Sequence, residues 1–494
     1  MTDFRIVVLW TDALIFVLLA GVLAFALHVR RTEHLRAPWR RVAQSRAGMA
    51  SSVVLVLFLV IGLLDSLHFR PAVAGSGKDG ERAYAVEVLS VFDLMATSLR
   101  ERKEKSYSAP LSAHLFSRQT VELPDGRLMR EYPRLTHGGA HLEDPTTEQG
   151  QDILKRVLQG LAVAAGLWAL LDLIVAWRLA RRHGTSVAQI HRAVWQGRTE
   201  VPWNTILVAV ALVLVVAAPI ILLSGYYHVL GTDKVGQDVL YLSLKSIRTG
   251  LVIGTLATLV TLPLALLLGI MAGYLGGRTD DLIQYLYTTL NSIPGVLLIA
   301  AAVLMTQVYM DTHPELFETV SHRADFRLLF LCIILGVTSW TGLCRLLRGE
   351  SLKLREMEYI QAAHAFGVPR LRIITRHILP NVMHIVLIAI VMDFSGLVLA
   401  EAVLSYVGVG VDPSMISFGT MINGARLEMA REPMVWWSLA AAFSFMFLLV
   451  LAANLFADSV RDAFDPRVRV RTPVADIGGT DGLPSGPALE GSHR

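Results

Sequence analysis

The sequence contains little cysteine and little charge for its length. Only two cysteines occur among 494 residues, Cys332 and Cys344, and both lie in or beside one apolar run. This number and placement exclude a disulfide framework and a cysteine-based metal site. Charged residues make up 17% of the chain, whereas soluble globular proteins average about 25%. Because 53% of the residues are hydrophobic, the composition predicts a membrane protein.

The sequence also lacks a motif that would bind nucleotide phosphates. A phosphate-binding loop needs a glycine-rich backbone and a lysine followed by serine or threonine. The nearest match, Gly75-Ser76-Gly77-Lys78, is followed by Asp79, and Ala72 stands where the loop needs its first glycine. We therefore interpret this stretch as a flexible linker and expect the chain to bind no ATP itself.

No recognisable catalytic set is present. His137, His141, Glu143 and Asp144 could in principle ligate a metal, but polar loop contacts are the favoured interpretation of this cluster. No nucleophile motif and no His-Glu-x-x-His helix accompanies them. The sequence thus predicts a protein that is not an enzyme, holds no metal and binds no cofactor of its own.

What the sequence does have is long apolar runs. A membrane-spanning helix needs about 20 mostly apolar residues. Nine stretches qualify, with approximate limits 8–28, 49–67, 156–178, 204–225, 247–274, 285–307, 328–348, 382–404 and 436–460. The first has only Arg5 before it and no small-residue cleavage site after it, so we interpret it as a retained span and not as a signal peptide.

Arginine and lysine gather in four segments outside these runs. The segments follow the first, third, seventh and ninth runs. Cytoplasmic loops carry an excess of Lys and Arg, and the four segments share one side if nine spans alternate. The sequence therefore predicts an N-terminus outside and a C-terminus in the cytoplasm.

A segment of mixed charge at 68–153 is predicted to lie outside the membrane as a small α+β insert. Between Glu81 and Lys105, apolar residues recur at helical spacing, which indicates an amphipathic helix. The stretch from Thr120 to Tyr132 predicts a hairpin around Pro124-Asp125-Gly126.

The most informative stretch is the basic loop 345–380. Its part 358–366 favours a helix, and Gly367 can end that helix without a Cβ penalty. Pro369 suits the first turn of a second helix, and Pro380 is expected to open the next span. The loop thus predicts two short helices across a glycine turn at the membrane surface. A basic loop that only lies on anionic lipid is the alternative, but lipid contact explains neither the glycine nor the paired alanines.

This loop resembles the EAA loop of ABC-importer permeases, the coupling helix that docks in a groove of the ATPase subunit. Gln361 stands where the family usually has glutamate, and Glu358 keeps an acidic group nearby. The resemblance implies an ATPase-coupling role for Glu358, Gln361, Ala362, Ala363, Gly367, Leu379 and Pro380.

Further motifs narrow the resemblance to the C-type subunit of dipeptide, oligopeptide and nickel permeases. These motifs follow the family's order over roughly residues 204–471. In the first motif, Gln237 stands in place of the usual arginine. The motifs are the GTD segment at 231–238, the GYxGG turn at 273–277, Thr338-Ser339-Trp340 with Arg345, the segment 401–410 and the ending 461–467. Residues singled out from the first and last are Gly231, Thr232, Asp233, Gly236, Asp238, Asp465 and Pro466.

The predicted fold is an all-α polytopic membrane protein: a six-span type I ABC importer permease core with extra N-terminal spans and the small α+β insert. Segment 36–71 also resembles the usual opening of the family, a basic segment followed by a first span. The predicted division is 1–67 for N-terminal spans and a basic loop, 68–153 for the insert, 154–203 for an extra span and loop, 204–471 for the core, and 472–494 for a disordered tail.

Charged residues inside spans are candidates for function, because burial in lipid is costly. Asp393 and Glu401 lie about two turns apart on the eighth span. These acids either line the translocation path or are structural. A structural acid here would be hydrogen-bonded to Ser395 or to a neighbouring helix. Asp12 and Asp172 lie outside the predicted core and are expected to tie the extra spans together.

The resemblance implies a permease subunit of an importer in the bacterial inner membrane, most commonly for peptides. Its implied partners are a second homologous permease, two ATPase subunits that hold ATP and Mg, an extracytoplasmic binding protein and membrane lipid, with no nucleic acid. The alternatives are a secondary transporter or channel with a regulatory loop, or a membrane-anchored enzyme or sensor. The coupling loop argues against the first, and the lack of a catalytic set argues against the second.

Overall fold

The computed structural model describes residues 4–76, 82–122, 128–317 and 319–464. Within this part of the chain, nine helices are long and apolar enough to cross a membrane. They are α1 (Trp10–Arg31), α3 (Arg46–Asp65), α6 (Pro145–His183), α8 (Trp203–Ser224), α9 (Val239–Leu275), α11 (Gly295–Thr312), α12 (Val320–Arg355), the continuous helix Arg370–Val407 and α17 (Trp437–Phe464). The prediction of an all-α polytopic membrane protein is confirmed.

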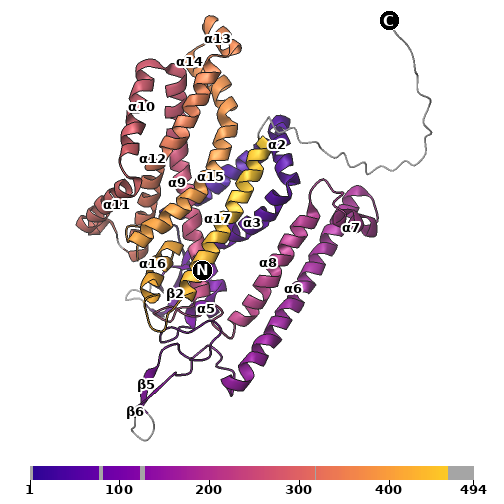
Figure 1. Cartoon of the computed structure of the whole chain (residues 1–494), viewed down its shortest axis with the longest axis vertical. Helices are drawn as coiled ribbons and strands as arrows, with labels where there is room; N and C mark the ends of the chain where they lie inside the picture. The colour runs from indigo at the N-terminus through magenta and orange to yellow at the C-terminus, as the bar shows by residue number, and fades with distance from the viewer. Residues whose placement is uncertain (1–3, 77–81, 123–127, 318, 465–494) are drawn as a thin grey trace, which may run out of the picture.

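Shorter helices and strands connect these spans. The helices are α2 (Glu33–Gln44), α4 (Val91–Met95), α5 (Thr97–Glu101), α7 (Val187–Trp195), α10 (Gly277–Ser292), the 3₁₀ turn η1 (Pro314–Leu316), α13 (Glu358–Ala365) and α16 (Phe418–Glu428). The strands are β1 (Phe4–Val7), β2 (His68–Ser76), β3 (Arg82–Tyr84), β4 (Leu89–Ser90), β5 (Gln119–Glu122) and β6 (Leu128–Glu131). Figure 1 places the β5–β6 hairpin and α13 at opposite ends of the molecule.

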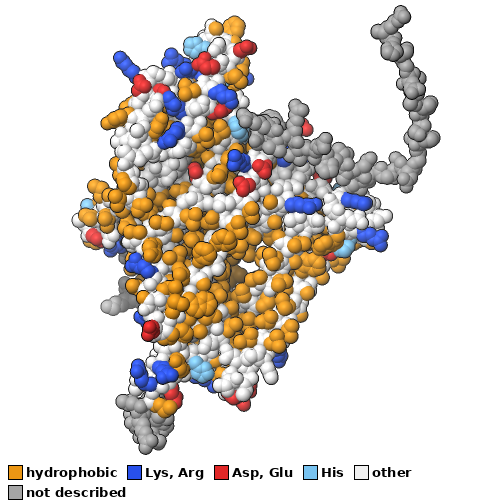
Figure 2. All heavy atoms as spheres, viewed as in Figure 1, with side chains coloured by type: hydrophobic (Ala, Val, Ile, Leu, Met, Phe, Trp, Pro, Cys, Tyr) orange, Lys and Arg blue, Asp and Glu red, His pale blue; other side chains and the backbone are white. Residues whose placement is uncertain are grey.

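Hydrophobic side chains cover the middle of the molecule and charged ones its ends. Figure 2 shows this band over α6, α8 and α17, with Lys, Arg, Asp and Glu gathered above and below it. Such a band is what a bilayer requires, because no water is available there to solvate charge.

The sixth predicted span, 285–307, is wrong in its limits. The chain breaks in its middle, where α10 ends at Ser292 and α11 begins at Gly295. Pro294 donates no backbone hydrogen bond, and a residue before proline avoids the helical region; Ile293 is extended accordingly, with ψ 130°. In Figure 1, α11 therefore projects sideways from the end of α10.

Small residues bring the central helices together. A Cβ on Gly269 or Gly273 of α9 would lie 2.8 Å or 2.5 Å from a backbone oxygen of α12, that of Cys344 or Arg348. Gly62 and Gly48 of α3 allow equally close contact with α9 and α17. Close backbone approach at glycine is the usual way in which membrane helices associate, and it makes α3 part of the central bundle.

The pair α6 and α8 stands apart as a two-helix arm. The helices lie side by side (Figure 1), and a Cβ on Gly160 of α6 would lie 2.6 Å from the backbone of Pro219 of α8. The Trp168 indole donates to the Leu207 carbonyl at 2.9 Å. The predicted core boundary at residue 204 grouped α8 with the following spans, whereas α8 packs mainly on α6 and touches the bundle through α3.

Strands from residues 4–7 and from the insert 68–153 form a small lobe, here called the insert lobe. β2 pairs antiparallel with β1, β3 and β4, so residues 4–7 join the sheet of the insert. The predicted hairpin is confirmed by β5 and β6, although its turn at 123–127 lies outside the described residues.

The single amphipathic helix predicted between residues 81 and 105 is wrong. This segment forms two strands and the two short helices α4 and α5. Ser90 starts α4 with a capping box that it shares with Asp93, and Ala96 interrupts helical geometry at φ −98°, ψ 22°. The apolar side chains of this segment instead pack against α3 and α9.

Candidate functional site

The loop between α12 and the eighth span forms the two helices predicted across a glycine. α13 spans Glu358–Ala365, and Gly367 follows with φ +73°. The amide of Gly367 donates to the His364 carbonyl, and that of Val368 donates to the Ala363 carbonyl, at 3.0 and 3.1 Å. This is the Schellman pattern, which needs a left-handed residue after the helix. Gly367 therefore sets the angle between α13 and α14 (Arg370–Ile373).

Three side chains hold α13 against the membrane helices. Ile360 is buried, and Ala363 and Val368 pack beside it in the cluster of α9 and α12 residues around Leu347. Glu358, Gln361 and Ala362 are exposed on the same helix. One face of α13 is thus packed against the membrane helices, and its other face is exposed.

Phe366 and Leu371 are further candidate site residues, which the sequence reasoning missed. Their exposed fractions are 87% and 72%, on either side of Gly367. An aromatic residue directly before a helix-ending glycine was the available signal. Large apolar side chains this exposed at a polar end of the molecule indicate a protein contact.

Pro380 does not open a new helix, contrary to the prediction. α14, the π turn Ile374–Ile378 and α15 (Leu379–Val407) form one helix. Pro380 has no N–H to give to the preceding turn, and the Leu379 amide donates to Ile374 instead of to residue 375. The π turn thereby accommodates the proline, with Leu379 half-buried against the bundle and Pro380 exposed.

A bidentate ion pair ties the start of the loop 345–380 to α10. The Arg348 guanidinium donates to both carboxylate oxygens of Asp280 at 2.5 and 2.7 Å. The GYxGG turn connects α9 to α10 through Gly276 and Gly277, both at positive φ. A rigid link therefore runs from α13 through α12 to α10.

The two acids of α15 differ in their surroundings. Glu401 is fully buried and accepts hydrogen bonds from Ser405 at 2.7 Å and from Ser417 at 2.9 Å. Ser417 is the N-cap of α16, so Glu401 joins α15 to α16. Asp393 is partly exposed, and no hydrogen bond to it is seen among the described residues. Glu401 therefore fits the role of a structural acid, whereas Asp393 stays a candidate for lining the translocation path.

The GTD segment forms a tight turn that ends at the start of α9. Asp238 is the N-cap of α9 and accepts from the amides of Leu240 and Tyr241. Asp233 accepts from the amides of Val235 and Gln237 within the turn. These bonds satisfy amides that would otherwise lack partners.

The same turn holds the insert. Thr232 bonds the backbone of Ser106 and Ser108. A Cβ on Gly236 would lie 1.8 Å from the Glu104 carbonyl oxygen, and one on Gly231 2.5 Å from the Ser108 oxygen. Gly231 and Gly236 also have φ +74° and +75°. Both glycines are thus required by backbone angle and by the close approach of the insert.

A buried histidine reinforces this contact. His228 lies 2.8 Å from Asp238 and 3.5 Å from Glu104. Burial alone would lower the pKa of His228, but these two carboxylates outweigh it and raise the pKa to about 9. Burial alone would raise the pKa of Glu104, but the neighbouring His228, together with hydrogen bonds from Thr136 and the His137 amide, outweighs it and holds that pKa well below the usual range.

A second polar cluster joins α1 and the insert to the bundle. Arg248 of α9 donates to Asp12 of α1 at 2.5 Å, and His68 lies 2.7 Å from the same acid. Asp325 of α12 accepts from the amides of Trp10 and Thr11 and so caps the N-terminus of α1. Asp12 therefore pairs with α9, a span of the predicted core, and not with another of the extra N-terminal spans as we expected.

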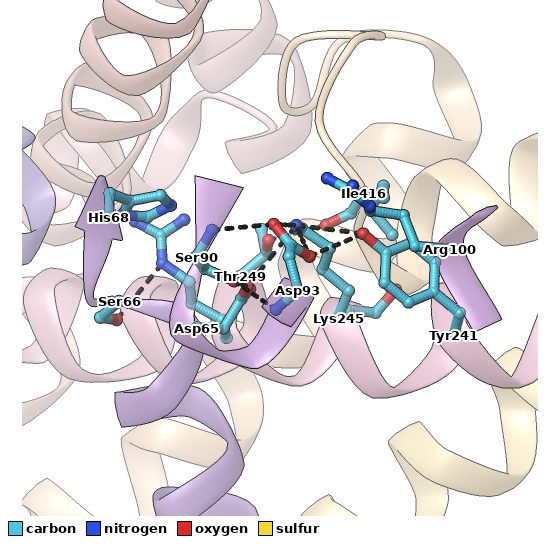
Figure 3. Close-up of polar contacts among 12 residues, drawn as sticks. Asp65, Ser66, His68, Ser90, Asp93, Arg100, Tyr241, Lys245, Thr249 and Ile416 are labelled. Atoms are coloured by element: carbon cyan, nitrogen blue, oxygen red, sulfur yellow. Dashed lines mark hydrogen bonds and ion pairs between the residues drawn. The ribbon is translucent and has the colours of Figure 1, made fainter. Parts of the chain in front are cut away.

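Figure 3 shows the neighbouring part of this cluster. Lys245 and Tyr241 of α9 point at Asp93 of α4, with the Lys245 nitrogen at 2.5 and 2.7 Å and the Tyr241 hydroxyl at 2.7 Å. Burial alone would raise the pKa of Asp93, but the Lys245 ammonium outweighs it and lowers the pKa. Asp65 accepts from Ser90 at 2.7 Å. These contacts were not predicted, because their partners are far apart in sequence.

The candidate metal cluster has other contacts. His141 lies 2.8 Å from Asp152, Asp144 caps α6, and the His137 amide donates to Glu104. Among the described residues, no group of three or more His, Cys, Asp or Glu side chains is placed to hold a metal. Asp465, Pro466 and Gly77-Lys78 lie outside the described residues.

Comparison with known proteins identifies the family. Residues 265–470 match the family model described as the binding-protein-dependent transport system inner membrane component. The oligopeptide transport system permease protein OppC of Haemophilus influenzae is 31% identical over 243 residues, which are 49% of this chain and 71% of that protein. This chain belongs to that permease family.

Other relatives agree. The dipeptide transport system permease protein DppC of Bacillus subtilis is 28% identical over 49% of this permease and 69% of its own length. The glutathione transport system permease protein GsiD of Pectobacterium atrosepticum is 32% identical over 49% of this permease and 73% of that protein. The permease is a multi-pass inner-membrane component of an ABC importer and not an enzyme. About half of its length lies outside each alignment.

Proposed function

We propose that this permease forms half of the translocation pathway of a peptide importer and receives the motion of ATPase subunits through α13. The peptide substrate is supported by the relatives, which are named for oligopeptide, dipeptide and glutathione transport. ATP and Mg are held by the ATPase subunits in this proposal. The observation that carries the proposal is the exposed face of α13 on a rigid base, with Phe366 and Leu371 projecting beside Gly367.

Three further partners follow from the proposal. A binding protein delivers the solute, as the family description implies. A second permease supplies the other half of the pathway. It would cover exposed apolar side chains on α11 and α15, among them Leu297, Met305 and Val308, and Leu399 and Val403.

We infer that the six-span core consists of α3, α9, the α10–α11 pair, α12, the helix Arg370–Val407 and α17. The close packing of α3 on α9 and α17 supports this grouping over one that begins at residue 204. The arm α6–α8 is then an insertion between the first two core spans. The arginine-rich segments support a cytoplasmic side at the α13 end, with the N-terminus outside.

Two substitutions at Gly367 test the coupling proposal. A Cβ on Gly367 would meet nothing within 4 Å, so Gly367→Asp leaves the chain's own packing intact. We expect Gly367→Asp to insert normally and to abolish ATP-driven uptake in proteoliposomes that hold the complete importer, because the side chain obstructs the ATPase contact.

Gly367→Ala is the matched control. It carries the left-handed strain, about 1 kcal/mol, without a bulky side chain, and should retain part of the uptake. Normal uptake by Gly367→Asp, with the ATPases still bound, would refute the coupling role.

A further inference from the structure

The end of the arm carries an arginine-rich surface that the transport proposal does not use. It comprises the last turns of α6, all of α7 and the connection 196–202 that leads to α8, and is here called the arm-end surface. Its arginines are exposed: Arg178, Arg181, Arg182, Arg192 and Arg198. Between residues 173 and 203 the one acidic residue is Glu200, which pairs with Arg40 of α2 at 2.5 Å. None of the five arginines forms an ion pair with an acid among the described residues.

This surface is rigid. Ser186 and Gln189 form a capping box at the start of α7. Ile190 and Val194 bury the apolar side of α7 in a cluster with Ala180 and Leu207. On the other side, His191 lies 2.9 Å from Asp172 of α6. The arginines are therefore presented on a fixed scaffold and not on a loose loop.

Aromatic and apolar side chains place the surface at a bilayer boundary. Trp177 and Trp195 are exposed, and the Arg181 guanidinium lies 4.0 Å above the Trp177 ring. Tryptophan is enriched where the bilayer meets water. Directly along α6, Leu167, Leu170, Leu171, Leu173 and Ile174 are also exposed. An acyl chain on this face therefore lies next to arginine at its polar end.

We propose that the arm-end surface binds the headgroup of an anionic phospholipid. Guanidinium groups form paired hydrogen bonds with phosphate oxygens, and basic clusters beside membrane helices attract anionic lipid. The excess of arginine over acid favours a negatively charged partner, and the exposed apolar face of α6 favours one with acyl chains. The arm would then anchor the permease in a shell of anionic lipid.

The experiment compares two lipids on the purified full chain in detergent. Phosphatidylglycerol or phosphatidylcholine is titrated, and bound lipid is counted by native mass spectrometry together with the thermal unfolding midpoint. We expect preferential binding of phosphatidylglycerol. In Arg181→Gln/Arg182→Gln, its apparent affinity should fall on the order of tenfold, since each basic residue near the surface adds to attraction. Glutamine keeps the helix propensity of α6.

The matched control removes two arginines at the other end of the molecule. Arg118→Gln/Arg130→Gln changes net charge equally and should leave phosphatidylglycerol binding unchanged. The proposal is overturned by equal binding of the two lipids, or by an equal loss in both double variants. Stabilisation by glycerol 3-phosphate equal to that by phosphatidylglycerol would also overturn it, because that molecule has the charge without acyl chains.

Discussion

Gly236 shows how one residue serves two contacts. Its left-handed backbone angle forms the GTD turn, and its missing side chain admits the Glu104 carbonyl. The motif at 231–238 singled out Gly236 from sequence, although the turn itself was not predicted. The partner was not predictable, because Glu104 lies in a segment that the family pattern does not include.

Substitution separates these two roles. Gly236→Ala should destabilise the protein by about 2–4 kcal/mol, because the Cβ collides with backbone in addition to its angular strain. Gly184→Ala is the control, since Gly184 also has positive φ but nothing lies within 4 Å of its Cβ; it should cost about 1 kcal/mol. Thermal unfolding of both purified variants measures the difference. Equal losses of stability in the two variants would mean that the Glu104 backbone moves aside at no cost.

His228 predicts a pH dependence of stability. Its folded pKa of about 9 lies above its ordinary value of 6.5. The stabilisation is therefore complete below about pH 6.5 and is lost as pH rises through about 9. Between pH 7 and pH 9.5 the free energy of unfolding should fall by about 2 kcal/mol, and the unfolding midpoint should fall with it. His228→Gln should be less stable at pH 7 and nearly flat over that window, and a wild-type slope in this variant would contradict the assignment.

The acids of α15 predict opposite outcomes. Glu401→Ala leaves two buried hydroxyls without an acceptor and should cost about 2–3 kcal/mol, whereas Glu401→Gln keeps an acceptor oxygen and should fold better. Asp393→Asn should leave the unfolding midpoint unchanged and reduce uptake if Asp393 lines the path. Uptake equal to wild type would assign Asp393 no role in transport.

At the scale of elements, hydropathy predicted where most spans lie but not how they pair. The apolar run of α8 looks like the first span of a core, since it directly precedes the GTD motif. Its assignment to the arm depends on Gly160 meeting Pro219, a contact between residues 59 positions apart. Likewise, the break at Pro294 is visible in sequence, yet the new direction of α11 depends on packing against α12.

The capping of α1 by α12 is testable by hydrogen exchange. Asp325→Ala removes the acceptor for the first amides of α1, and loss of an N-cap costs about 1 kcal/mol. Amides at Trp10 and Thr11 should exchange several-fold faster, with α17 unchanged as internal control. Asp325→Asn retains one acceptor oxygen and should show a smaller effect. Unchanged exchange in Asp325→Ala would mean that the other contacts of the N-terminal segment, among them the Asp12–Arg248 pair, hold the start of α1 without the cap.

At the scale of the whole molecule, α13 and the β5–β6 hairpin lie at opposite ends. The hairpin projects beyond the insert lobe (Figure 1), with Met129 and Tyr132 exposed on or beside it. In the proposed orientation the hairpin lies on the side from which a binding protein would deliver solute, and we propose that it contacts that protein.

Removal of the hairpin tests that role. Residues 119–131 replaced by a short Gly-Ser linker should abolish or weaken association with the binding protein, measured by co-purification of the assembled importer. This deletion spares Glu104, whose amide donates to the Gly236 carbonyl and so holds the lobe to the core. An elution profile equal to that of the wild type would show that the importer with the deletion still assembles. Association and uptake equal to wild type would leave the hairpin as a cover for the lobe.

The cap on α1 also imposes an order of events during synthesis. Trp10 is separated from Asp325 by 315 positions, and at about 5–20 residues per second the acid emerges on the order of 15–60 s after the helix that needs it. His68 and Arg248, the partners of Asp12, are made before Asp325, so these contacts can form while the leading amides of α1 still lack their acceptor. The cap from α12 is therefore among the last contacts that α1 makes.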